Sequence, residues 1–179
     1  MSRETVFHIL ITGIMLAILL LLGVLPTGAD PYAYLFQPVL LMAVLSGILS
    51  GTVYAAAVGI LAPLFAMLLF RRLPFMPDTL TLMISYGIAG VVSGVFYSLF
   101  RTSIGAAVGG VLAWLGGYGV TRILVHLSMG ESYFFTNYLN ETFVRAWPGL
   151  VLTLVLVPLI TVLLRNKGAM WVLRHERDD

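Results

Sequence analysis

Long apolar stretches separated by short polar segments dominate this chain. Most of them hold about 20 residues with few charges, the length that a helix needs to cross a hydrocarbon core of roughly 30 Å. Prolines and charges gather between them, above all in residues 71–78, where an irregular backbone could not face lipid. The pattern predicts a single domain over residues 1–179, an all-α integral membrane bundle of six transmembrane helices. The expected helices cover about residues 5–25, 35–48, 52–70, 79–100, 104–127 and 141–164.

Composition supports the membrane interpretation and narrows the function. Hydrophobic residues make up 60% of the chain and charged residues 10%, with a mean hydropathy of +1.01, far outside soluble usage. A net charge of +2 is too small to favour a nucleic-acid partner, and the lack of cysteine excludes disulfides and thiolate metal ligands. The first apolar stretch lacks an Ala-x-Ala exit and precedes further spans, so we expect a retained helix and not a cleaved signal.

The distribution of Lys and Arg predicts the orientation of the bundle, because short cytoplasmic loops hold an excess of both. With both termini inside, the cytoplasmic side would carry most of the basic residues, namely Arg3, Arg101, Arg165, Lys167, Arg174 and Arg177. Only Arg71 and Arg72 would then lie in an outer loop. The longer connections at 26–34, 71–78 and 128–140 would all face outward, where they could close over one pocket. The expected location is a cell membrane.

Small residues four positions apart mark faces where helices in lipid can approach closely. Three pairs are typical of packing inside one bundle: Ala55 with Gly59, Gly90 with Gly94, and Gly105 with Gly109. Gly13 and Ala17 form a fourth pair on the first helix, which has an outer face free to meet another protein. We therefore predict a partner interface at Gly13 and Ala17.

One arginine lies well inside an apolar stretch. Arg122 recurs with Tyr118 and His126 every four residues, so the three side chains share one face of the expected fifth helix. A charge at the bilayer centre costs at least ~2.5 kcal/mol on insertion scales, so such residues usually face the bundle interior and find a partner. Glu141, at the start of the sixth helix, is the partner we expect first. A purely structural ion pair between the two would explain Arg122 without any ligand.

The alternative is a small-molecule site, in which a few polar groups converge between apolar walls. Its candidate polar residues are Gln37, Arg122, His126, Asn137, Asn140 and Arg145, and its candidate flat walls are Tyr86, Tyr118 and Trp147. No metalloprotease motif, phosphate-binding glycine loop or defensible nucleophile–base pair is present, so the sequence predicts neither an enzyme nor a cofactor.

Four segments carry a recognisable pattern: Phe-Gln-Pro-Val-Leu-Leu at 36–41 with the small-residue turn that follows, Gly-Ile-Leu-Ala-Pro-Leu at 59–64, Ser-Tyr-Gly-Ile-Ala-Gly at 85–90, and Pro-Gly at 148–149. Together they resemble the substrate-binding S components of energy-coupling factor (ECF) vitamin transporters. The resemblance implies a six-helix subunit of a prokaryotic plasma membrane that captures a vitamin-like small molecule outside the cell. It also implies a transmembrane coupling subunit and two cytoplasmic ATPases as partners. Gly13 and Ala17 stand where the family has an Ala-x-x-x-Ala motif that meets the coupling subunit.

The chain departs from the family pattern at positions that bear on which ligand is bound. Phe36 stands where related sequences often have His, Leu82 where they often have Glu, and Thr153 where an amide is common. Pantothenate, cobalamin, folate and queuosine-type precursors stay open, and the cationic stripe slightly favours a ligand with a carboxylate or phosphate. The rival interpretation is a non-transport scaffold of the cell-envelope or rod-shape machinery (MreD-like), which would not need converging polar side chains.

Overall fold

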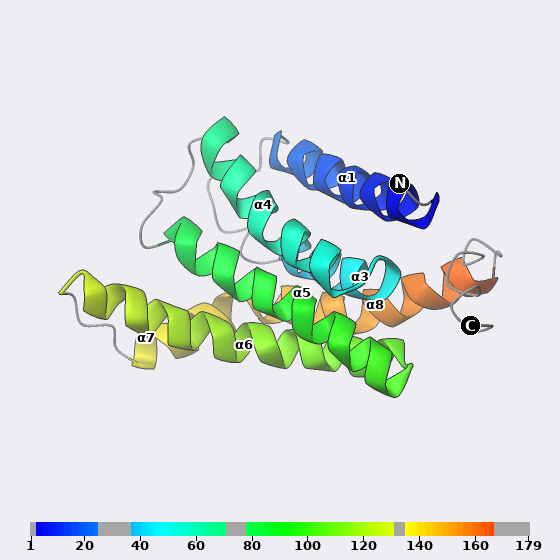
Figure 1. Ribbon diagram of the computed structural model, residues 1–179. Coiled ribbons are helices and arrows are strands. Elements are labelled where there is room, and N and C mark those ends of the chain that lie inside the picture. The colour runs from blue at the N-terminus through cyan, green and yellow to red at the C-terminus, as the bar shows by residue number, and fades with distance from the viewer. Residues whose placement is uncertain (1–2, 25–36, 71–77, 131–134, 167–179) are drawn as a thin grey trace.

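The computed structural model describes residues 3–24, 37–70, 78–130 and 135–166, and nearly all of these residues are helical (Figure 1). The described elements are α1 (Arg3–Val24), α3 (Pro38–Leu49), α4 (Thr52–Phe70), α5 (Leu80–Phe100), α6 (Ser103–Ser128), α7 (Phe135–Leu139), the π-helical η2 (Asn140–Arg145) and α8 (Trp147–Asn166). The expected loop at 26–34, residues 71–77 of the expected loop at 71–78, and the ends of the chain lie outside the described residues.

Four of the described helices are long and apolar enough to cross a membrane. They are Thr52–Leu69, Leu80–Phe100, Ser103–Ser128 and Trp147–Leu164. The apolar helical stretches Thr5–Leu21 and Pro38–Leu49 are shorter. With 12 residues, α3 is only about 18 Å long. The chain is therefore an all-helical membrane protein in the part that the structure describes, while the count of six spans stays a prediction.

The helix that was expected at 141–164 begins differently. The chain first forms the short α7 and the π-helical turn η2, and α8 starts only at Trp147. Thr142 lies inside this π turn and donates a hydrogen bond to the carbonyl of Tyr138 at 2.6 Å. Proline is tolerated at both helix starts, at Pro38 in α3 and at Pro148 in α8, because the first N–H groups of a helix have no partner within it.

Close backbone contacts place α5 at the centre of the bundle, between α4 and α6 (Figure 1). A Cβ atom added to Gly59 of α4 would lie 2.5 Å from the backbone carbonyl of Tyr86 in α5. A Cβ at Gly47 of α3 would lie 2.8 Å from the carbonyl oxygen of Gly90 in α5. Only glycine allows helices to approach this closely. The paired small residues of α4 and α5 thus serve packing within one bundle.

Interhelical and local hydrogen bonds satisfy most hydroxyl groups of the interior. Ser93 of α5 donates to the carbonyl of Val44 in α3 at 3.1 Å. Other hydroxyls bond to the carbonyl four residues earlier in their own helix, as Ser85 does with Thr81 at 2.6 Å and Thr153 with Gly149 at 2.8 Å. These bonds keep polar side chains compatible with an apolar interior.

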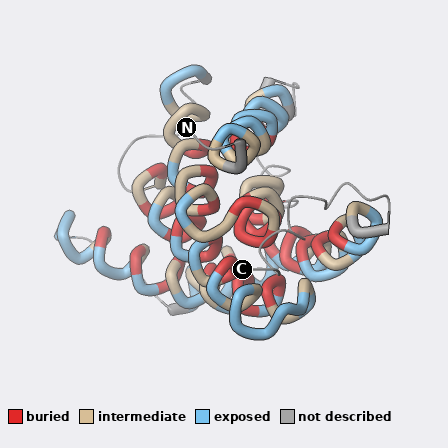
Figure 2. The backbone as a smooth tube through the Cα atoms, turned by 45° about the vertical axis from the view of Figure 1, so that its right-hand side comes forward, coloured by how far each residue is buried: buried red, intermediate tan, exposed pale blue. Residues whose placement is uncertain are grey.

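The outer surface of the helices is strongly apolar. Figure 2 shows buried residues on the sides where helices face one another and exposed residues on the outward sides. Large apolar side chains are exposed on every long helix, among them Leu21 at 68%, Val53 at 76% and Leu99 at 69%. Lipid is the environment in which such a surface is stable.

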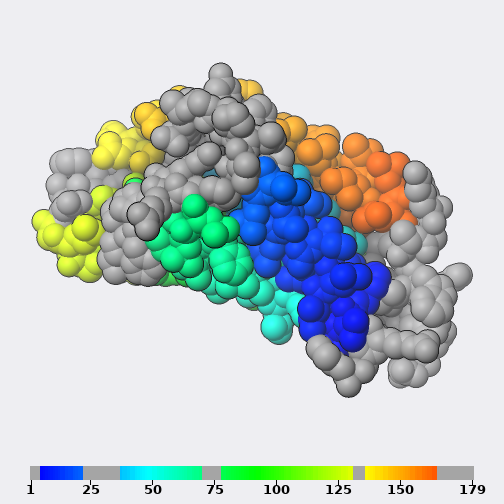
Figure 3. Space-filling view, turned by 90° about the horizontal axis from the view of Figure 1, so that it is seen from above, coloured from blue at the N-terminus to red at the C-terminus, as the bar shows by residue number. Residues whose placement is uncertain are grey.

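The first helix packs at the edge of the bundle, against α4 and α3. Its buried side chains are Thr12, Met15 and Leu19. Gly13 and Ala17 are on the opposite, exposed face, and a Cβ added to Gly13 would meet no atom within 4 Å. Seen from above, α1 forms part of the surface of the molecule (Figure 3). The position expected for a partner interface is thus open.

Candidate functional site

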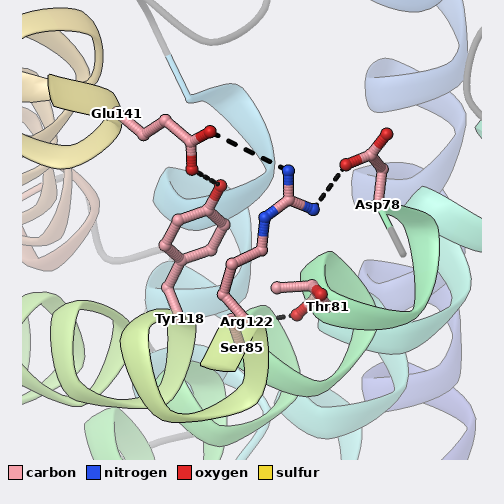
Figure 4. Close-up of polar contacts among 6 residues, drawn as sticks. All are labelled: Asp78, Thr81, Ser85, Tyr118, Arg122 and Glu141. Atoms are coloured by element: carbon pink, nitrogen blue, oxygen red, sulfur yellow. Dashed lines mark hydrogen bonds and ion pairs between the residues drawn. The ribbon is translucent and has the colours of Figure 1, made fainter. Parts of the chain in front are cut away.

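An ion-paired cluster lies where the end of α6 meets the starts of α5 and α8. Nη1 of Arg122 in α6 lies 2.5 Å from Oδ1 of Asp78, directly before α5, and Nη2 lies 3.8 Å from Oε1 of Glu141 in η2. Figure 4 shows the guanidinium between the two carboxylates. The expected pairing of Arg122 with Glu141 is present, but the shorter contact is to Asp78. The sequence marks Asp78 only as a carboxylate in a loop.

Tyr118 connects this cluster to the interior. It lies one turn before Arg122 on α6, and its hydroxyl donates a hydrogen bond to Oε2 of Glu141 at 2.7 Å. Glu141 therefore has one oxygen on Tyr118 and the other toward Arg122 (Figure 4). Bonds to a charged acceptor are stronger than those between neutral groups. The carboxylate thus holds both side chains on one face of α6.

A row of stacked aromatic rings continues from Tyr118 into the core. Tyr118 stacks on Trp114 with ring centroids 5.2 Å apart, and Trp114 stacks on Tyr86 of α5 at 6.2 Å, both within about 20° of parallel. We call Tyr86, Trp114 and Tyr118 the aromatic row. All three side chains are buried. Trp114 extends the four-residue spacing of Tyr118, Arg122 and His126 by one turn, so the same periodicity could have identified it from sequence.

Gln37 closes the other end of the aromatic row. The hydroxyl of Tyr86 donates to Oε1 of Gln37 at 3.4 Å, and the Gln37 side chain is 2% exposed. Its backbone is left-handed, with φ 42°, directly before Pro38 begins α3. Non-glycine residues with positive φ are uncommon and persist where the surroundings hold them. The buried amide is therefore held at the start of a helix in the core.

The predicted site residues fall into two groups. Gln37, Tyr86, Tyr118 and Arg122 belong to the connected set just described, and His126 is half-buried one turn beyond Arg122 on the same face of α6. The other four have exposed side chains: Asn137 in α7, Asn140 and Arg145 in η2, and Trp147 at the start of α8. The structure does not bring these four into the cluster, and their role in binding stays a prediction.

Tyr138 fastens α7 to α6 beside the site. Its hydroxyl donates to the carbonyl of Leu115 at 3.0 Å, and its ring lies where a Cβ on Gly119 would be, 2.9 Å away. Burial raises the pKa of the Tyr138 phenol above its ordinary value. The short helix before η2 is thus anchored one turn from Tyr118.

No protein-family model, curated protein or solved structure matches this chain. Its function must therefore be argued from the site itself.

The cluster holds groups that could contact a ligand. Within the described ranges no group of three His, Asp or Glu side chains could hold a metal ion. The site offers charged groups of both signs, a buried amide and flat rings beside apolar walls. An apolar groove of about 400 Å³ between α4 and α5 is lined by Ile60, Met83, Gly87 and Val91 among others. Its lining residues are almost all apolar, and such a surface is of the kind that lipid covers.

Proposed function

We propose that this chain is the substrate-capture subunit of an ECF-type vitamin transporter in a prokaryotic plasma membrane. In this role it crosses the membrane six times with both ends in the cytoplasm. It binds a vitamin-like small molecule from outside and passes it inward with a transmembrane coupling subunit and two ATPases. The observation that carries the proposal is the convergence of polar groups from separate helices at one end of an apolar bundle.

The elements that contribute to this convergence fit the orientation of the proposal. Gln37 precedes α3, Asp78 precedes α5, Arg122 lies near the end of α6, and Glu141 precedes α8. In the six-span arrangement these positions all belong to the outer side. A ligand-binding subunit for uptake requires its polar groups on that side.

The open face of α1 supports the proposed partner. Gly13 and Ala17 are exposed, and the other side of their helix packs on the bundle. The small residues of α4 and α5, in contrast, already contact neighbouring helices inside the bundle. A helix of the coupling subunit could approach closely at Gly13 and Ala17. A rod-shape scaffold could also use this face, but it would have no need for the buried row that joins Gln37 to Glu141.

Native mass spectrometry of the purified chain, released from detergent, tests the proposal. A retained molecule of vitamin-like mass, together with co-purifying coupling and ATPase subunits, is the expected result. A chain without small molecule that co-purifies with cell-shape or envelope proteins would replace the transporter with the scaffold.

A further inference from the structure

The ion cluster has more negative than positive charge among the described residues. Asp78 and Glu141 both face Arg122, so two carboxylates surround one guanidinium and leave a formal charge of −1. From sequence, the stripe around Arg122 favours an anionic ligand. Because two carboxylates already occupy the guanidinium, the charge left for a ligand has the opposite sign.

The exposed fraction of each side chain determines which of these charged groups a ligand contacts first. The side chain of Arg122 is 13% exposed, whereas Asp78 is 24% and Glu141 28% exposed. In Figure 4, one oxygen of Asp78 points at Arg122 and the other points away from it. A molecule that reaches the cluster therefore contacts carboxylate oxygens, and the guanidinium lies behind them.

The aromatic row supplies a second, independent indication of a ligand. Trp114 is 2% exposed, and its Nε1–H has no hydrogen-bond acceptor among the described residues. An indole nitrogen can only donate, and a buried donor without an acceptor is costly. The ring stacks against Tyr118, whose hydroxyl is bonded to Glu141. An acceptor atom in a ligand would satisfy this donor of Trp114.

We propose, on the basis of the capture function above, that the ligand is an organic cation: a flat nitrogen heterocycle with a positively charged group against Asp78 and Glu141. A ring acceptor of the same molecule faces Trp114. His126 lies one turn beyond Arg122 on the same face of α6, and Tyr118 lies one turn before it. Arg71 and Arg72 precede Asp78 in the chain but lie outside the described residues, so the sign of the ligand charge is the decisive quantity to measure.

The test measures the melting temperature of the purified full chain in detergent with three vitamin pools at pH 7. The cationic pool holds thiamine and pyridoxamine, the neutral pool nicotinamide and riboflavin, and the anionic pool pantothenate, biotin and folate. The proposal expects stabilisation by the cationic pool alone. Stabilisation by the anionic or the neutral pool alone overturns it and leaves the capture function standing. A folded chain that no pool stabilises overturns the cation proposal and leaves the capture function to be decided by native mass spectrometry.

Matched variants connect the result to the cluster. Glu141→Gln removes the excess charge at nearly constant shape and is expected to weaken binding of the active cation at least tenfold. Glu141→Asp keeps the charge and should retain the preference for cations. Arg101→Gln changes a charge at the opposite end of α5 and should leave binding unchanged. Equal cation affinity in Glu141→Gln and the unaltered chain would overturn the proposal.

Discussion

The hydroxyl of Tyr118 donates a hydrogen bond to Oε2 of Glu141 at 2.7 Å and so joins α6 to the π-helical turn before α8. The two residues are 23 positions apart, and Glu141 lies inside η2, which precedes α8. Because the acceptor is charged and partly buried, this single bond couples the position of the last long helix to the ion cluster.

Replacing Tyr118 by Phe should therefore destabilise the fold by about 1.5 kcal/mol, the lower range for a bond to a charged group. Unfolding in mixed detergent micelles would measure the change. Tyr97→Phe is the control, since the Tyr97 hydroxyl makes no hydrogen bond within the described residues, and it should change little. Equal effects in both variants would show that the bond contributes nothing specific.

Removing Arg122 should cost stability, because its guanidinium is the counter-charge of both Asp78 and Glu141. Arg122→Ala leaves Asp78 and Glu141 without their counter-charge in a partly buried site, and we expect a loss of about 2 kcal/mol. The triple variant Asp78→Asn, Arg122→Gln, Glu141→Gln removes all three charges together and should regain most of that stability, while cation binding is lost with the two carboxylates. Calorimetry of folding and of ligand titration separates the two quantities. A triple variant as unstable as Arg122→Ala would contradict the argument from charge balance.

The glycine contacts of α5 predict a contrast between two alanine substitutions. Alanine adds roughly 1 kcal/mol of helix propensity at either position. At Gly59 the new Cβ would collide with the Tyr86 backbone, so Gly59→Ala should still be destabilising by about 1–3 kcal/mol. Gly13→Ala meets open space and should be neutral or slightly stabilising. Thermal unfolding of both variants tests this ordering, and the reverse order would refute the packing described here.

Assembly with a coupling subunit should depend on the exposed face of α1. Gly13→Leu places a large side chain where close helix approach is proposed, and we expect loss of the complex in pull-down with ligand binding intact. Gly116→Leu is the matched control, because Gly116 is also exposed and has no atom within 4 Å of an added Cβ. An intact complex in Gly13→Leu would remove α1 from the interface.

The bond between Ser93 and Val44 offers a smaller effect. Interhelical bonds inside membrane proteins average about 0.6 kcal/mol. Ser93→Ala should lose about that amount, whereas Ser98→Ala loses only an exposed local bond to the carbonyl of Val95. Unfolding equilibria in micelles would distinguish them; indistinguishable variants would mean that α3 and α5 are held by packing alone.

Periodicity predicted much of the site because it operates within one helix. The four-residue spacing placed Tyr118, Arg122 and His126 on one face, and the structure has them there. Hydropathy likewise located the apolar helices, since their lengths and compositions are local properties. The pairing of Arg122 with Glu141 could also be predicted, because the expected fifth and sixth helices that carry these residues are neighbours in sequence.

Properties that depend on contacts between distant segments could not be predicted from the sequence. Asp78 meets Arg122 across 44 residues, and nothing local distinguishes it from the other carboxylates of the expected outer side. Because the chain forms the π-helical turn η2 first, α8 begins only at Trp147. Hydropathy does not predict a π-helical turn. For Asn137, Asn140 and Arg145, polarity indicated a site, but the side chains are exposed.

The length of α6 determines how deep the ion cluster lies. With 26 residues, α6 is about 39 Å long, some 9 Å more than a typical hydrocarbon core. Arg122 stands six residues before the end of α6, or about 9 Å along its axis. If the surplus length extends from that end, the guanidinium reaches the headgroup boundary, where hydration and snorkelling lower the cost of a charge. Hydrophobic mismatch would then link occupancy of the cluster to bilayer thickness, with a thicker membrane drawing these charges deeper.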